Sequence, residues 1–129
     1  MNRETSITIV RAYLAACEAR RLDDAQRFLA PGAELIFPGG RYRSVDEMVA
    51  AARRRYRWAR KTAEEWDVDV RGDGTVVVVN TGRLSGENLQ GVSFDGVRYI
   101  DRFVLADDRI ISQQVWNDLD VSGVLTQTP

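Results

Sequence analysis

The clearest alternation of apolar and polar residues lies between positions 91 and 120. It predicts two long strands joined by a turn at 106–109. On the first strand, Asp101 falls in one row with large apolar side chains, namely Val97, Tyr99, Phe103 and Leu105. A carboxylate in such a row is costly unless it is hydrogen-bonded or protonated. Asp101 is therefore either a structural carboxylate bonded to a backbone N–H or an arginine, or a functional group in a pocket.

Helical spacing of apolar residues predicts three helices in the N-terminal half, over residues 5–21, 23–29 and 44–61. Ser44 and Glu47 form a capping box at the start of the third helix. A short strand is expected at 33–37, followed by a turn.

The C-terminal half predicts four long antiparallel strands. The first two cover residues 65–71 and 75–85, on either side of a Gly-Asp-Gly hairpin turn, and the other two lie within 91–120. Helices followed by antiparallel strands indicate an α+β fold with one domain over residues 1–129. A curved sheet closed by helices forms a cone, and such a cone can hold an apolar cavity.

Composition and charge exclude several classes of protein. The chain has 129 residues and a formal net charge of -1, so no overall field favours a nucleic acid. The basic, aromatic-containing stretch at 53–61 suggests nucleic-acid binding, but a solvated helix face explains it better. The sequence has no membrane-spanning run and no secretory signal, so we expect a cytoplasmic protein that binds neither membrane nor nucleic acid.

The chemistry available to the chain is limited by two residue counts. There is no histidine and one cysteine, Cys17, which excludes histidine-based triads, cysteine–histidine nucleophiles and thiolate metal clusters. We expect Cys17 to be a small core residue; the alternative is a reactive thiol, but nothing nearby marks it as a stabilised thiolate. Tyr13, beside the apolar stripe of the first helix, either packs in the core or places its hydroxyl in a cavity. We predict no metal, nucleotide or flavin cofactor.

Several phrases of the chain resemble the nuclear transport factor 2-like superfamily. They are AYLAA at 12–16, the segment 22–38, YIDRF at 99–103 and VWNDLD at 115–120. The resemblance is to the SnoaL-like branch, which includes polyketide cyclases, limonene epoxide hydrolase and, more distantly, ketosteroid isomerase. It implies a cone-shaped curved antiparallel sheet packed against three N-terminal helices, with a hydrophobic pocket.

The resemblance also implies roles for individual residues. Relative to ketosteroid isomerase, Tyr13 and Asp101 fall at the oxyanion-hole positions, while Phe37 stands where the general base would be. Relative to limonene epoxide hydrolase, Arg83 falls near the catalytic arginine and Asp118 resembles an acid of the triad. The central aspartate of that triad is replaced by serine here.

The last strand has two possible orientations. Either Gln113, Val115 and Asn117 point inward, or Trp116 and Asp118 do, and a bulge near 113–114 could satisfy parts of both. With the last strand left open in this way, the candidate ligand-binding residues are Phe37, Tyr56, Tyr99, Phe103, Trp116 and Asn117.

Three functional hypotheses follow. The first is an enzyme acting on a small apolar carbonyl, epoxide or polyketide-like molecule, with Asp101, Tyr13, Asp118 and Arg83 as catalytic groups. The second is a binding protein that uses the same pocket without turnover. The third is an interaction module that uses the exposed sheet face to form a homodimer or to bind another macromolecule, through the valine run at 76–79 and the strand containing Trp66.

Overall fold

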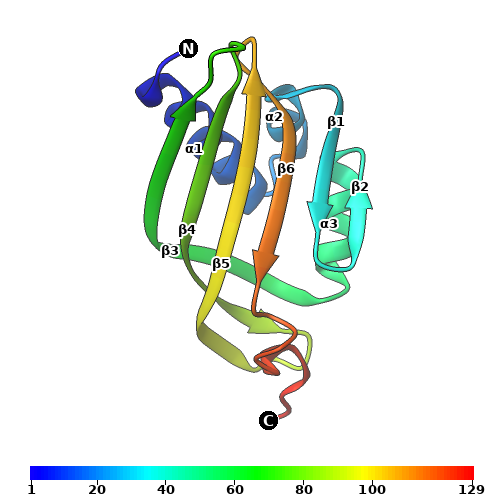
Figure 1. Ribbon diagram of the computed structural model, residues 1–129. Coiled ribbons are helices and arrows are strands. Elements are labelled where there is room, and N and C mark those ends of the chain that lie inside the picture. Colours follow the sequence, from blue (N-terminus) through cyan, green and yellow to red (C-terminus); the bar gives the residue numbers. More distant parts are fainter.

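The computed structural model describes all residues, 1–129, and has an α+β fold in which three helices cover one face of a six-stranded sheet (Figure 1). The strand order is β2-β1-β6-β5-β4-β3. The elements are α1 (Arg3–Glu18), α2 (Leu22–Arg27), β1 (Leu29–Phe37), β2 (Gly40–Tyr42), α3 (Val45–Arg53), β3 (Tyr56–Val70), β4 (Val76–Asn88), β5 (Ser93–Ala106), β6 (Arg109–Asn117) and a short 3₁₀ helix, η1 (Val124–Thr126). We call the sheet face against the helices the inner face and the opposite one the outer face.

The sheet is mixed, whereas the sequence predicted an antiparallel one. Four pairs of strands that follow each other in the sequence are antiparallel, namely β1–β2, β3–β4, β4–β5 and β5–β6, but β1 lies parallel to β6, with Leu35 opposite Gln113. Strands paired in parallel need a long connection between them. Here that connection is most of the chain, which explains why local sequence patterns did not reveal the pairing.

Of the two predicted helix caps, that of α1 is wrong and that of α3 is confirmed. Asn2, rather than Thr5 or Ser6, caps α1, because its Oδ1 accepts a hydrogen bond from the Thr5 N–H at 2.9 Å. The capping box of α3 is confirmed: the Ser44 Oγ accepts from the Glu47 N–H at 3.2 Å.

The third helix is the main correction to the sequence-based assignment. It ends at Arg53, and the residues expected to continue it to Lys61 belong instead to β3. The cause is tertiary pairing, since β3 lies against β4 from the Tyr56–Asn88 pair to the Val70–Val76 pair. The basic stretch is therefore a strand whose side chains alternate between the two sheet faces.

Smaller differences concern the ends of other elements. The second helix ends at Arg27, two residues early, so β1 begins at Leu29 instead of position 33. The turn expected at 38–40 leads into a short strand, β2. The strand β4 continues to Asn88, through residues that the sequence assigned to a loop.

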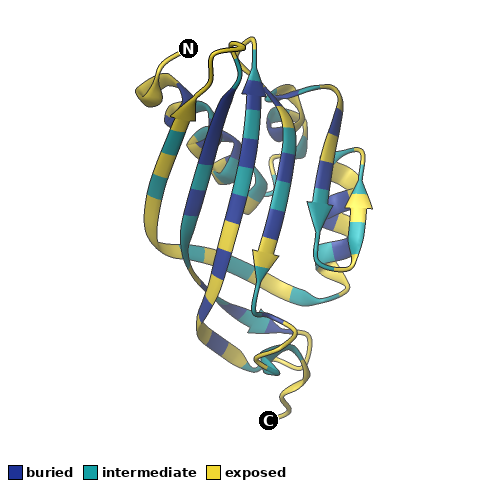
Figure 2. Ribbon diagram, viewed as in Figure 1, coloured by how far each residue is buried: buried dark blue, intermediate teal, exposed yellow.

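The alternation predicted for β5 is confirmed (Figure 2). Its five inward positions, including Asp101, are buried, and the positions between them are exposed or half-buried. Phe103 is fully buried and meets the ring of Tyr13 edge-on, with ring centroids 6.0 Å apart. Three residues of the valine run are buried as well, Val76, Val77 and Val78. None of the helices is long and apolar enough to cross a membrane.

Candidate functional site

A cavity of about 120 Å³ lies between the helices and the inner face of the sheet. Most of its lining residues are hydrophobic, 14 of 22, so a ligand inside it would contact mainly apolar surface. The walls come from the C-terminal half of α1, from α3, from the start of β3 and from β5 and β6. The polar groups that interrupt this apolar surface define the site.

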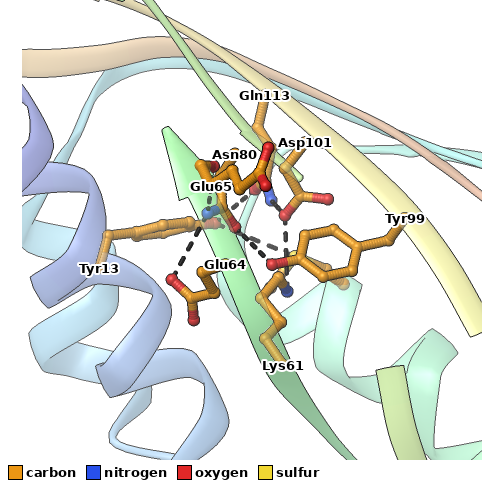
Figure 3. Close-up of polar contacts among 9 residues, drawn as sticks. Tyr13, Lys61, Glu64, Glu65, Asn80, Tyr99, Asp101 and Gln113 are labelled. Carbon is orange, nitrogen blue, oxygen red and sulfur yellow. Dashed lines mark hydrogen bonds and ion pairs between the residues drawn. The ribbon is translucent and has the colours of Figure 1, made fainter. Parts of the chain in front are cut away.

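The central polar group is a pair formed by Asp101 on β5 and Lys61 on β3 (Figure 3). The Lys61 Nζ lies 3.5 Å from the Asp101 Oδ2, and both residues line the cavity. Lys61 is the only lysine among the chain's 18 basic residues. All other basic residues are arginines. The only lysine side chain therefore lies next to Asp101, which is the only buried carboxylate of the protein.

A second chain of contacts reaches Asp101 from α1. The Tyr13 hydroxyl donates to the Gln113 Oε1 at 2.8 Å, and the Gln113 Nε2 donates to the Asp101 Oδ2 at 3.5 Å. Tyr13 itself is fully buried and belongs to the core cluster behind the cavity wall. It therefore fixes the amide of Gln113, which in turn orients the carboxylate of Asp101.

Tyr99 contacts the Lys61 end of the Asp101–Lys61 pair. The Lys61 Nζ lies 4.9 Å from the centroid of the Tyr99 ring, close enough for a cation–π contact. The Tyr99 hydroxyl donates to the Asn80 Oδ1 at 2.8 Å, and the Asn80 Nδ2 donates to the Glu64 Oε2 at 3.4 Å (Figure 3). The ring is thereby held at a fixed orientation next to the ammonium.

Burial and charge set the protonation of the pair. Burial raises the pKa of Asp101, although the charge of Lys61 and hydrogen bonds from Lys61 and Gln113 act in the opposite direction. Burial is the largest single effect and lowers the pKa of Lys61, but the charge of Asp101, together with Tyr56, Cys17 and the hydrogen bond to Asp101, leaves that pKa above its ordinary value. Lys61 is therefore an ammonium ion at neutral pH, and not a nucleophilic amine.

The two oxygens of Asp101 differ in their surroundings. Both contacts described above are made by Oδ2, and Oδ1 has no partner in the protein. No fully buried side-chain oxygen or nitrogen of the protein lacks a hydrogen bond. Oδ1 therefore opens to the cavity, where a ligand atom can reach it.

Two further titratable groups near the cavity, Cys17 and Tyr13, are held neutral. Burial raises the pKa of the Cys17 thiol to about 11, and burial also raises the pKa of the Tyr13 hydroxyl well above its usual range. Cys17 lines the cavity as a thiol rather than as a reactive thiolate. No group of three or more histidine, cysteine, aspartate or glutamate residues could hold a metal ion.

The structure brings together about half of the residues singled out from the sequence. Asp101 lines the cavity, as do four of the expected ligand-binding residues, Phe37, Tyr56, Tyr99 and Asn117. Phe103 lies in the core, and Trp116 is 51% exposed on the outer face. Arg83 and Asp118 also line a groove on the outer face, where Asp118 pairs with Arg98 at 2.7 Å.

The orientation of the last strand is settled by its burial. Gln113 and Val115 are buried, and both line the cavity with Asn117, whereas Trp116 points outward. A bulge in β6 does exist, but it lies at Ile111, between the pairs Val104–Ser112 and Leu105–Ile110. It precedes the predicted position by two residues, so the alternation beyond it is regular.

Sequence reasoning missed Lys61, because the residue was assigned to the solvated end of a helix. A signal was present: this is the chain's only lysine, in a stretch where every other cation is arginine. Arginine and lysine are not interchangeable, since the compact ammonium titrates and moves where the guanidinium does not. Asn80, which carries the hydrogen bond from Tyr99, gave no comparable signal.

Comparisons with known proteins agree with this fold. The structure resembles TerC co-crystallised with polyporic acid, with a TM-score of 0.75, 16% identity, and coverage of 95% of this chain and 99% of that one. A nuclear transport factor 2-like protein of unknown function from Burkholderia pseudomallei gives a TM-score of 0.71, 19% identity, and coverage of 98% and 100%. A protein assigned as a SnoaL-like polyketide cyclase from Jannaschia gives 0.70, 21% identity, and coverage of 100% and 99%.

The fold class is therefore that of the nuclear transport factor 2-like proteins, as the sequence predicted. The model of the SnoaL-like domain family matches residues 10–113, which is most of the chain. The chain belongs to the SnoaL-like domain family. No curated protein sequence matches it.

Proposed function

We propose that this protein transfers a proton to and from carbon in a small, mostly apolar carbonyl compound, as an isomerase or cyclase without a cofactor. The observation that carries the proposal is the Asp101–Lys61 pair, which faces an apolar cavity with one carboxylate oxygen free. A carboxylate with a raised pKa is a better base, and a fixed ammonium beside it can stabilise a developing oxyanion.

The two members of the pair divide the chemistry. Asp101 removes a proton from the carbon next to the carbonyl, the electron pair of that C–H bond forms a carbon–carbon double bond, and the π pair of the C=O bond moves onto the oxygen. Lys61 stabilises the resulting enolate through its charge. Where the compound also carries a β,γ carbon–carbon double bond, the enolate is a dienolate, and the proton returns from Asp101 to its γ-carbon, which gives the α,β-unsaturated isomer. Alternatively, the enolate carbon attacks a second carbonyl carbon of the same molecule, which closes a ring and restores the first carbonyl, and the new alkoxide takes up the proton from Asp101.

Asp101 thus has a different role from the one implied by ketosteroid isomerase. That resemblance casts it as a protonated donor, with the base elsewhere, at the position of Phe37. Here a cation 3.5 Å away favours the charged carboxylate, and Phe37 supplies apolar wall. The epoxide hydrolase interpretation receives less support, because Arg83 and Asp118 lie on the outer face, across the sheet from Asp101.

Family membership supports the same class of reaction. The Jannaschia relative is assigned as a polyketide cyclase, and TerC was crystallised with polyporic acid. The alternative is a binding protein without turnover. In that case Lys61 and Gln113 would serve only to satisfy a buried carboxylate, and the cavity would hold its ligand unchanged.

The test is deuterium exchange at the carbon next to the carbonyl, followed by proton NMR in D₂O. Suitable probes are acetophenone, 2-tetralone and cyclohexane-1,3-dione. We expect exchange above the buffer rate, and a loss of about 100-fold or more in Asp101→Asn. Lys61→Met tests the oxyanion role, and Asp67→Asn is the control, because Asp67 is an exposed aspartate on β3.

The outcomes separate the two functions. If probes bind but exchange no faster than in buffer, the protein is a binder and the catalytic proposal is wrong. If Asp101→Asn and Asp67→Asn reduce exchange equally, the base is not Asp101.

We also propose that the outer face joins two copies of the chain. Ile100 and Trp116 are neighbours across β5 and β6 and are 45% and 51% exposed, which is unusual for large apolar side chains. Light scattering should give a dimer for the wild type and a monomer for Trp116→Glu. A monomeric wild type would refute this proposal. The cytoplasmic location stays a prediction.

A further inference from the structure

Three cations line the cavity: Arg20, Arg55 and Lys61. Arg20 lies just after the end of α1 and differs from the other two. Lys61 pairs with Asp101, and Arg55 pairs with Asp120 at 2.8 Å. Arg20 forms no salt bridge, and its Nη1 donates only to a backbone carbonyl, the Cys17 O, at 3.4 Å.

The lining carboxylates do not neutralise Arg20. Only Glu18 and Asp101 line the cavity, and each faces another cation. Glu18 lies 3.8 Å from Arg60, and Asp101 pairs with Lys61. Arg20 is half-buried as a residue, and no carboxylate compensates for the water that its side chain loses.

The backbone of Arg20 is also in an unfavourable conformation. Its φ is 59°, in the left-handed region, directly after Ala19 ends the helix. Glycine is the usual residue at this position, and asparagine is tolerated, because other side chains are strained there. An arginine therefore stands where glycine would be less strained, although Ala63, Asp107 and Asp108 share this conformation.

The charge of Arg20 acts on the interior of the cavity. Burial raises the pKa of the Cys17 thiol, and the positive charges of Lys61 and Arg20 both act to lower it. Cys17 lines the cavity, so both cations lie close to the same part of its wall. A molecule in the cavity would therefore meet the Asp101–Lys61 pair and a second, unneutralised cation.

We infer that the ligand is a carboxylic acid: a small, mostly apolar molecule whose carboxylate binds the guanidinium of Arg20. The inference rests on the proposed function, because that function places the reacting carbon of the same molecule at Asp101. Guanidinium binds carboxylate through two parallel hydrogen bonds, which fixes orientation as well as position. A neutral ligand would leave Arg20 with no carboxylate partner.

The test compares matched acids and amides. The probes are benzoate and naphthalene-2-carboxylate, each with its carboxamide, titrated against the protein by NMR at constant ionic strength. We expect at least one acid to bind about tenfold more tightly than its amide, as a charge-assisted hydrogen bond predicts. Arg20→Gln should abolish this preference, and Arg20→Lys should keep part of it.

Arg21→Gln is the matched control, because Arg21 is the exposed neighbour of Arg20 and does not line the cavity. It should keep the full preference for the acid. If no acid binds better than its amide, or if Arg20→Gln keeps the preference, the inference is wrong. An equal loss in Arg21→Gln would reduce the effect to overall charge and would overturn it too.

Stability separates a binding role from a structural one. Arg20→Asn should leave Tm unchanged or raise it, because asparagine tolerates the left-handed conformation. A fall in Tm would show that Arg20 supports the fold, and would overturn the inference. Failure of the proposed function appears elsewhere, as absent deuterium exchange in a protein that still prefers acids through Arg20.

Discussion

Replacement of Asp101 by asparagine should change the ionisation of Lys61. At an effective dielectric constant of about 20, unit charges 3.5 Å apart attract each other by about 5 kcal/mol. The side chain of Lys61 is 22% exposed, so part of this attraction is screened, and a few kcal/mol is a reasonable expectation. Burial, which lowers the pKa of Lys61, would then act without its main opponent. We expect the pKa of Lys61 to fall below its ordinary value in Asp101→Asn.

The measurement is a carbon NMR titration of protein labelled at the ε-carbon of lysine. Only one side-chain signal will appear, because Lys61 is the only lysine. The wild type should titrate above free lysine and Asp101→Asn below it, while Asp67→Asn should match the wild type. If Lys61 titrates identically in Asp101→Asn and in the wild type, the ion pair does not control the site and our reasoning is wrong.

Three further predictions concern stability. Tyr13→Phe leaves the Oε1 of Gln113 without its donor, so urea unfolding should show a loss of about 1–3 kcal/mol. Gly86→Ala places a methyl group against the Trp58 carbonyl and should cost at least as much, measured in the same way. Because the folded pKa of Asp101 is raised, its contribution to stability is complete below the unfolded pKa and is lost as pH rises through the folded value. This pH dependence should be absent from Asp101→Asn.

The sequence predicted the parts of the fold that depend on local periodicity. The inward row on β5 and the Ser44 capping box are local patterns, and the structure confirms both. The α3–β3 boundary depends instead on pairing with β4, a strand more than twenty residues away, so helical spacing gave the wrong answer. The parallel pairing of β1 with β6 is more distant still.

The candidate site was predictable to a similar degree. Asp101 was found because a carboxylate in an apolar row conflicts with its surroundings, which one strand alone reveals. Its partner could not be found in that way, since Lys61 is 40 positions earlier and its strand was assigned as a helix. The two orientations of β6 that the sequence allowed differ by a shift of one residue, and this shift decides whether Gln113 or Trp116 faces inward. Only the register of β6 against β5 in the structure resolves it.

The position of the only lysine also places a single protease cleavage site in the wall of the cavity. An endoprotease specific for lysine has one cleavage site in this chain, after Lys61, within the paired region of β3. Cleavage requires an extended, accessible backbone, so the native hairpin must open before the chain is cut into two fragments. The rate of appearance of those fragments measures the opening free energy of this part of the sheet. A ligand that binds the closed cavity should slow it in proportion to its occupancy.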